Sequence, residues 1–234
     1  VQERMKSERM KAELITNVSH DIKTPLTSII NYVDLLKQEN IQDEKAREYI
    51  EILENKSQRL KKLTEDLVEA SKVSTGNIAM KLEKINIVEL IKQATGEFED
   101  KFKKRELEPI INSNQNEINI MADSKYMYRI IENLYSNISK YALENSRVYV
   151  DIKVHKTEPV PNVQIEIKNI SKDRLNISAD ELMQRFVRGD KSRTSEGSGL
   201  GISIAQNLTE LQQGIFELKL DGDLFKVKLT FNTI

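Results

Sequence analysis

The chain of 234 residues contains no cysteine and no tryptophan. Without cysteine it has no disulfide bond, no thiolate nucleophile and no thiolate zinc site. No run of apolar residues approaches the roughly 18 needed to cross a bilayer. Basic and acidic residues number 36 and 37, so the net charge of −1 predicts no general attraction to nucleic acid. We therefore expect neither a nucleic-acid partner nor a membrane-spanning segment in these residues.

Charged residues make up 31% of the chain and aromatic residues only 6%, a balance that favours long solvated helices. Over residues 1–73, apolar side chains recur every three or four positions, with a polar interruption at 39–43. Ile50, Leu53 and Leu60 follow at near-heptad spacing. This pattern predicts a helical hairpin that pairs with a second copy as a four-helix bundle, because two amphipathic helices cannot cover both apolar stripes alone. A coiled-coil spacer without chemistry is the alternative interpretation.

A different pattern follows the short linker at 74–77. Apolar and polar residues alternate over 148–155 and 163–167 as in half-buried strands, and a terminal strand pair flanks a turn at 221–223. Helical patterns lie between these strands at about 87–104, 124–143 and 199–213. We therefore expect a second domain over 78–234, in which a layer of helices covers one mixed sheet.

A histidine with polar neighbours lies midway along the first predicted helix. Asp21 follows His20 directly and can accept a hydrogen bond from the ring Nδ1–H, which leaves Nε2 free for nucleophilic attack. Thr24 lies one helical turn further along the same face, where its hydroxyl can orient a water molecule against a phosphorylated imidazole. A lone histidine on a helix is ordinarily a surface residue, so these neighbours carry the interpretation that the three residues are catalytic.

A second polar cluster lies on the helix predicted at 124–143. Asn133 and Asn137 are four residues apart, and Lys140 and Tyr141 follow within one turn, so all four share a face. Amide oxygens suit Mg²⁺ that is already bound to phosphates, a lysine neutralises phosphate charge, and a tyrosine ring can contact a nucleobase. The alternative is an ordinary solvent-exposed face.

Three of the eight glycines, Gly197, Gly199 and Gly201, fall within five residues, with Leu200 between the last two. They directly precede an apolar helical pattern, and Arg188 and other basic residues precede them. Glycine allows backbone N–H groups to approach phosphate oxygens, and the start of a helix attracts negative charge. This arrangement predicts a phosphate-binding lid.

These segments, in this order, resemble the sensor histidine kinases of two-component systems, over nearly the whole chain. The segment around His20 resembles the H box, and 133–141 resembles the N box. The F box corresponds to 183–188 and the G2 box to 197–201. The resemblance implies a dimerisation and histidine phosphotransfer domain over 1–73, followed by an α/β-sandwich, Bergerat-type ATP-binding domain over 78–234.

The resemblance also implies an activity, ATP:protein-histidine phosphotransfer, with ATP and Mg²⁺ as cofactors. His20 is then the phospho-acceptor, Asp21 its acid–base partner and Thr24 the residue of the phosphatase signature. The partner that receives the phosphoryl group is an aspartate of a response-regulator receiver domain. Because the chain begins at Val1 inside a charged helical pattern, we expect a cytoplasmic fragment, and the family's habit implies a membrane anchor in the missing upstream segment.

The same resemblance assigns the residues that contact the nucleotide, and it makes Asn137 a metal ligand as well. The nucleotide contacts are Asn133, Asn137, Lys140, Tyr141, Asn169, Arg188, Gly197, Gly199, Leu200 and Gly201. One departure from the family concerns Asn169 and Ser171, which stand where an aspartate followed shortly by glycine is usual. An amide oxygen still accepts from the adenine amino group, but it carries no charge. This departure motivates a second interpretation, a dimeric signalling scaffold or phosphatase-dominant pseudokinase that binds ATP weakly.

Overall fold

The computed structural model divides the chain into two compact units, 1–77 and 78–234. The residues that it describes are 22–39, 41–74, 76, 78–155, 160–175, 177–183 and 199–234. Within these ranges, none of the helices combines the length and the apolar character that a bilayer crossing requires.

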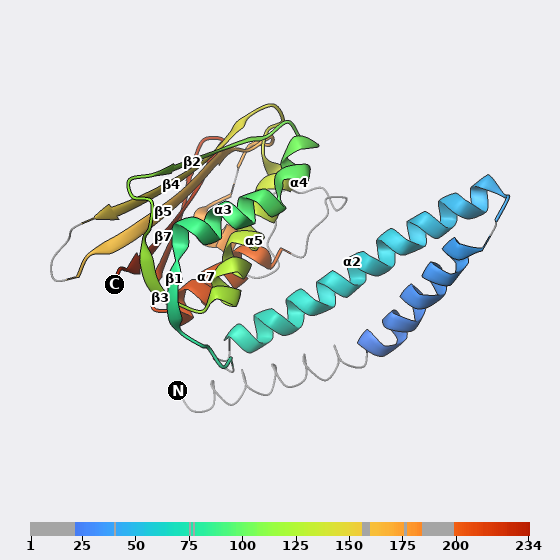
Figure 1. Ribbon diagram of the computed structural model, residues 1–234. Coiled ribbons are helices and arrows are strands. Elements are labelled where there is room, and N and C mark those ends of the chain that lie inside the picture. The colour runs from blue at the N-terminus through green and yellow to red at the C-terminus, as the bar shows by residue number, and fades with distance from the viewer. Residues whose placement is uncertain are drawn as a thin grey trace. The chain divides into compact units, whose positions relative to one another are not determined.

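The first unit is the predicted helical hairpin (Figure 1). A helix over 22–38 is followed by a turn and then by α2, Glu44–Ser74. Asp43 begins α2, since its Oδ1 accepts a hydrogen bond of 3.0 Å from the backbone N–H of Ala46. An ion pair of 2.7 Å between Lys37 Nζ and Glu54 joins the two helices.

The apolar stripe of the hairpin has an inner and an outer part. Leu26 and Val33, seven residues apart, are buried within one chain, and so is Ile50 of α2. Other members of the stripe remain exposed at the same spacing of seven, namely Ile22, Ile29 and Leu36 on the first helix and Leu53 and Leu60 on α2. A repeat of seven places each set on its own side of its helix, so these exposed side chains are left uncovered among the described residues of one hairpin.

The second unit contains a five-stranded mixed sheet with strand order β2-β4-β5-β7-β6. Its strands are β2 (Glu108–Ser113), β4 (Arg147–His155), β5 (Asn162–Ile170), β6 (Ile215–Asp221) and β7 (Leu224–Asn232). β2 and β4 are parallel, and all other neighbours are antiparallel. The predicted terminal hairpin is confirmed as β6 and β7, with Gly222 at φ 56 in its turn, where glycine avoids the strain of a Cβ.

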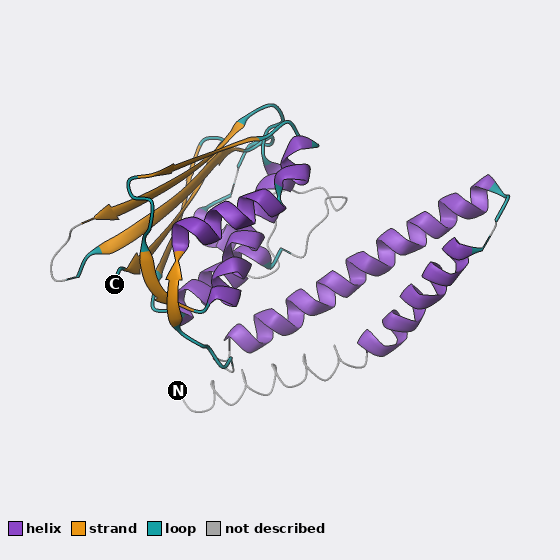
Figure 2. Cartoon of the chain, in the orientation of Figure 1, coloured by secondary structure: helices purple, strands orange, loops and turns teal. Residues whose placement is uncertain are grey.

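Helices cover one face of this sheet (Figure 2). The helices are α3 (Ile87–Glu97), α4 (Glu99–Lys103), α5 (Ser124–Tyr141), α6 (Ala179–Met183) and α7 (Gly201–Leu211). A separate antiparallel pair joins β1 (Glu83–Asn86) to β3 (Asn119–Ala122). Inward residues of β4, β5 and β7 are fully buried and alternate with half-buried polar residues, as expected for a sheet with one covered face. A layer of helices on one mixed sheet is therefore confirmed.

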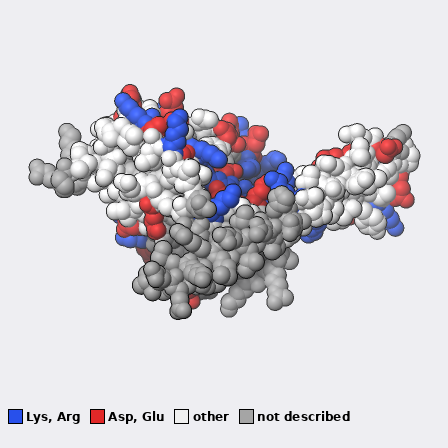
Figure 3. All heavy atoms as spheres, turned by 90° about the horizontal axis from the view of Figure 1, so that it is seen from below, with Lys and Arg blue, Asp and Glu red and all other residues white. Residues whose placement is uncertain are grey.

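The opposite face of the sheet carries alternating charges. Lys168 pairs with Asp151 at 2.8 Å and with Glu166 at 3.0 Å, and Lys226 also pairs with Glu166. Partial burial raises the pKa of the Glu166 carboxyl, but hydrogen bonds from the two lysines outweigh it and hold the pKa below its ordinary value. Figure 3 shows the molecule from below relative to Figure 1, and in this view too acidic and basic side chains of the described residues lie close together.

The helical pattern expected at about 87–104 is confirmed, but the segment breaks at Phe98 into two helices, α3 and α4. Phe98 adopts φ −93 and ψ 0, a conformation that ends the first helix, and its N–H donates to carbonyls of the preceding turn. The break directs the ring of Phe98 towards Phe102 and Tyr135, with centroids 5.9 and 5.6 Å away. Packing of this aromatic cluster stabilises the bend.

Candidate functional site

The polar cluster predicted at 133–141 lies on α5. The helix begins after Asp123, whose Oδ1 accepts from the N–H groups of Lys125 and Tyr126. Its inner side is apolar and fully buried. Asn133 interrupts that apolar character, since it is buried with 8% exposure. A polar side chain at such a position normally has a hydrogen-bond partner, so its environment is informative.

Asn133 lies beside the start of α7. A Cβ built on Gly201 would be 3.5 Å from Asn133 Oδ1, a van der Waals contact that places the first residue of α7 beside the Asn133 side chain. The Asn133 Nδ2 atom is buried and has no hydrogen-bond partner among the described residues. A buried amide without a partner costs free energy unless a ligand or water satisfies it. The structure therefore brings together two of the predicted ligand contacts, Asn133 and Gly201.

The end of α5 is joined to the end of β5. The N–H of Leu143 donates to the carbonyl of Ile170 at 2.8 Å, and the N–H of Lys172 donates to the carbonyl of Tyr141 at 2.9 Å. Ser171 is buried, and its N–H donates to the carbonyl of Asp223 at 2.7 Å. These bonds place the C-terminal turn of the polar helix next to the strand that carries Asn169, although the two segments are about thirty residues apart in the sequence.

Asn169 presents an unsatisfied acceptor at this junction. Its side chain is buried, and its Nδ2 donates to the carbonyl of Ile170 at 3.1 Å. Only the nitrogen of the amide can face a carbonyl, so the bond determines which way the amide points. Its Oδ1 is buried and has no partner within the described part of the chain. A buried acceptor of this kind suits the amino group of a planar base.

The first turn of α7 has no side-chain cap. Leu200 is the N-cap residue and makes no side-chain capping bond, and Gly199 before it has φ 70. N–H groups at such a helix start attract an anion. Because Gly201 approaches Asn133, this helix start and α5 form two sides of one site.

Two family models match the chain in sequence order. Residues 10–76 match the His Kinase A (phospho-acceptor) domain, and residues 122–232 match the histidine kinase-, DNA gyrase B- and HSP90-like ATPase. Together they account for most of the chain. The chain belongs to the sensor histidine kinases.

Known members of the family are similar along most of the chain. The sensor histidine kinase WalK of Bacillus subtilis is 27% identical over 217 residues, and the sensor protein VanS of Enterococcus faecium is 30% identical over 209 residues. These alignments cover 92% and 86% of the chain but 35% and 52% of the relatives. The chain thus spans between about a third and a half of the length of these curated proteins.

Solved histidine kinase structures share the fold. Full-length ShkA in complex with AMPPNP aligns with a TM-score of 0.77 at 19% identity, over 95% of this chain and 46% of ShkA. ThkA in complex with the response regulator protein TrrA aligns with a TM-score of 0.67 at 20% identity, over 100% of this chain and 65% of ThkA. The predicted fold class, a helical hairpin followed by a mixed α/β ATPase-type domain, is confirmed.

Several of the residues predicted for this histidine kinase's site lie outside the described residues, namely His20, Asp21, Arg188 and Gly197. Thr24 is exposed on the helix over 22–38. Asn137, Lys140 and Tyr141 are half-buried on the last two turns of α5. The roles assigned to all of these residues stay predictions.

A network around Asp123 was not anticipated from the sequence. Its Oδ2 accepts from the N–H of Lys81, and its own N–H donates to Gln212 Oε1 at 2.8 Å. The Gln212 amide in turn donates to the carbonyl of Leu208 in α7. Asp123 thereby connects the start of α5, the end of α7 and the segment that enters the domain. An aspartate directly before a helical pattern is the signal that could have identified the cap.

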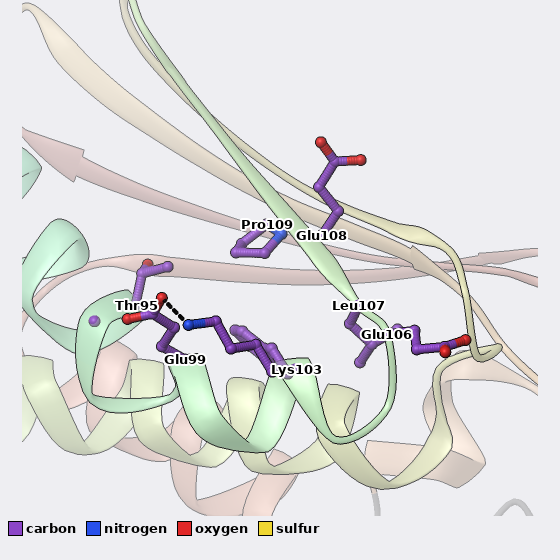
Figure 4. A pocket seen from close by; sticks show the side chains of 9 residues that line it. Thr95, Glu99, Lys103, Glu106, Leu107, Glu108 and Pro109 are labelled. Carbon is purple, nitrogen blue, oxygen red and sulfur yellow. Dashed lines mark ion pairs between the residues drawn. The ribbon is translucent and has the colours of Figure 1, made fainter.

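A pocket of about 500 Å³ lies elsewhere on the second unit, between α4 and β2 (Figure 4). Thr95, Phe102, Leu107 and Pro109 contribute to its lining, and Glu99 and Lys103 pair across its rim at 2.6 Å. None of the residues predicted to contact nucleotide lines it. This pocket is distinct from the site formed by α5, α7 and the end of β5.

Proposed function

We propose that this histidine kinase transfers the γ-phosphoryl group of ATP to its own His20 and then passes it to an aspartate of a response-regulator receiver domain. The observation that carries the proposal is the presence of both family domains in one chain, with the phospho-acceptor domain first. The similar kinase ThkA forms a complex with the response regulator protein TrrA, which supports a partner of the same kind here.

The residues at the second unit's site fit a nucleotide. Asn169 offers a buried acceptor for the adenine amino group, and the start of α7, whose N-cap residue makes no side-chain capping bond, can direct N–H groups at phosphate. Asn133 supplies a buried amide donor with no partner among the described residues. Lys140 and Tyr141 lie further along α5 and are assigned to phosphate and base.

We assign Mg²⁺ to Asn137, whose amide oxygen is a hard ligand of the kind this ion uses together with phosphate oxygens. When bound, Mg²⁺ neutralises charge on the phosphates. Among the described residues, no group of three or more His, Asp or Glu side chains forms a metal cage. The fit therefore depends on amide oxygens and on the nucleotide's own phosphates.

The reaction on the hairpin uses three side chains. We assign Asp21 the role of accepting a hydrogen bond from the Nδ1–H of His20, which would keep the Nε2 lone pair available. As the bond between the γ-phosphorus and its bridging oxygen breaks, an N–P bond forms at Nε2 and ADP departs. We assign Thr24, one turn further on, to a phosphatase reaction in which its hydroxyl orients the attacking water.

We also propose that two hairpins associate as a four-helix bundle. The exposed residues at a spacing of seven, Ile29 and Leu36 on one helix and Leu53 and Leu60 on the other, support this state. A second copy would bury these side chains further, and because they are 43–48% exposed within one hairpin, each would contribute about 1 kcal/mol.

Labelling with γ-³²P-ATP tests the assignment. The wild-type chain should acquire acid-labile, base-stable phosphate, and His20→Gln should abolish it because no nucleophile remains at that position. His155→Gln is the matched control, since His155 is the second of the two histidines and lies on β4. Labelling that survives in His20→Gln and is lost in His155→Gln would overturn the assignment.

The competing function is a signalling scaffold or phosphatase that binds ATP weakly, and the neutral Asn169 favours it. A ligand at a hundred times its Kd stabilises the folded state by about 2.7 kcal/mol. If millimolar MgATP raises the thermal midpoint of the second unit, the kinase is supported. An unchanged midpoint would support the scaffold.

A further inference from the structure

Arg105 lies in the turn between α4 and β2. Its guanidinium reaches the end of α5, where Nη1 donates to the carbonyls of Ser139 and Lys140 at 3.4 and 3.3 Å. Nη2 donates to the carbonyl of Ala142 at 3.1 Å. One side chain thus caps three carbonyls at the C-terminus of a long helix.

The last carbonyls of a helix have no partner within the helix, and the C-terminus carries a partial negative charge. α5 ends in Tyr141, and Ala142 then leaves the helix in an extended conformation without a glycine to close the end. Arg105 therefore takes the place of the C-terminal glycine motif that closes many helices. The planar guanidinium suits this role because it presents several donors in fixed directions.

The turn that carries Arg105 is itself held in place. The N–H of Leu107 donates to the carbonyl of Phe102 at 2.9 Å, and Phe102 is buried against the ring of Tyr135 on α5. An ion pair of 2.9 Å joins Arg105 Nε to the exposed Glu144 beyond the end of α5, although Nε makes no hydrogen bond among the described residues. The three helix carbonyls therefore hold the guanidinium, and Glu144 adds an electrostatic attraction.

We propose that Arg105 is a positioning residue for the nucleotide site, which rests on the proposed function. It holds the final turn of α5, and with it Lys140 and Tyr141, in the geometry that the ligand meets. It also holds Ala142 and Leu143, which form the connection to β5. Arg105 acts through these residues and makes no contact with the nucleotide itself.

The test compares Arg105→Ala with Arg105→Lys and with Lys104→Ala, an exposed neighbour of the same charge in the same turn. The first readout is hydrogen exchange without ligand at the N–H groups of Ala142 and Leu143, which bond to Ile138 and Ile170. Arg105→Ala should accelerate this exchange about tenfold relative to β4 and β5, because one charge-assisted hydrogen bond contributes about that factor. Lys104→Ala should leave the exchange rate at the wild-type value, and the rate in Arg105→Lys should lie between those of wild type and Arg105→Ala.

The second readout is nucleotide binding and turnover. Arg105→Ala should raise the Kd and KM for MgATP about tenfold and leave kcat at saturating MgATP within about twofold, since binding energy restores the turn. Unchanged exchange and affinity in Arg105→Ala would overturn the proposal. Equal acceleration of exchange across the whole sheet would also overturn it, because that result indicates general destabilisation. If the wild-type chain binds no MgATP, the proposed function fails, whereas the exchange of Ala142 and Leu143 still decides the role of Arg105.

Discussion

Replacing Asn169 with aspartate should lower the folding stability of the nucleotide-free protein and raise its affinity for adenine nucleotides. The substitution removes the Nδ2–H bond to the carbonyl of Ile170 and brings a carboxylate oxygen against that carbonyl at about 3 Å. The lost bond costs about 1 kcal/mol, and two acceptors facing each other in a buried position add about 1–3 kcal/mol. We expect the second unit to lose about 2–4 kcal/mol of stability at neutral pH.

The loss of folding stability in Asn169→Asp should grow as the pH rises. Burial raises the pKa of the introduced carboxyl above the unfolded value of about 3.9. The variant therefore keeps its stability below that value, where the protonated acid can donate to Ile170, and loses stability as pH rises through the folded-state pKa. Urea unfolding of Asn169→Asp and wild type at several pH values between 4 and 8 measures this difference, which should widen with pH.

The same substitution should favour nucleotide binding, although it destabilises the nucleotide-free protein. A charged acceptor forms a hydrogen bond about 1 kcal/mol stronger than a neutral one, so ATP should bind roughly fivefold more tightly to folded Asn169→Asp. GTP carries a carbonyl where adenine has its amino group, so its affinity should not rise. Calorimetric titrations with both nucleotides make this comparison, with Asn169→Ala as the control that weakens ATP. If Asn169→Asp is as stable as wild type at pH 8 and gains nothing for ATP, the buried Oδ1 does not face the base.

Three further substitutions test the packing around the site. Burial raises the pKa of Tyr135 to about 12, and its hydroxyl lies 2.9 Å from that of Thr95. Tyr135→Phe should lower the free energy of urea unfolding by about 1 kcal/mol. Thr95→Val should lower it by about 2 kcal/mol, because the buried Tyr135 hydroxyl then has no partner. The Thr95 hydroxyl donates to the carbonyl of Ile91 at 2.8 Å, so the Tyr135 hydroxyl is the donor between the two, and equal costs would contradict this assignment. Gln213 has φ 61 after α7, so Gln213→Gly should stabilise the second unit by about 1 kcal/mol and raise its thermal midpoint by about 2–4 °C. Gly214→Ala would place a methyl 2.5 Å from the buried ring of Phe231, and we expect a loss of about 1–3 kcal/mol by the same assay, whereas an unchanged midpoint would mean that the ring moves freely.

The hairpin shows which structural features a periodic sequence pattern can predict and which it cannot. Apolar spacing in residues 1–73 was sufficient to predict two helices and a turn near 39–43. The spacing did not reveal which members of the stripe face inward, and the structure buries Leu26 and Val33 while exposing Ile22 and Ile29. Both sets have the same hydrophobicity, so only the position of the second helix distinguishes them.

The second domain shows the same limit in its strands. β5 and β7 were predicted because long alternating patterns survive in the sequence. β1 and β3 have four residues each, too few for a clear alternation, and they pair across more than thirty residues. The helix break at Phe98 also went unpredicted, because it depends on an aromatic cluster that includes Tyr135 of another helix.

For the site, the sequence alone determined which side chains share a helix face: Asn133 and Asn137 are one turn apart wherever α5 lies, since the helix repeat is local. It also determined the order of the motifs and hence the family. Only the tertiary structure decided that Gly201 lies against Asn133, that the Asn169 oxygen has no partner among the described residues, and that Arg105 caps α5. Those facts join segments far apart in the chain, and such contacts depend on how all the elements pack together, which no local repeat encodes.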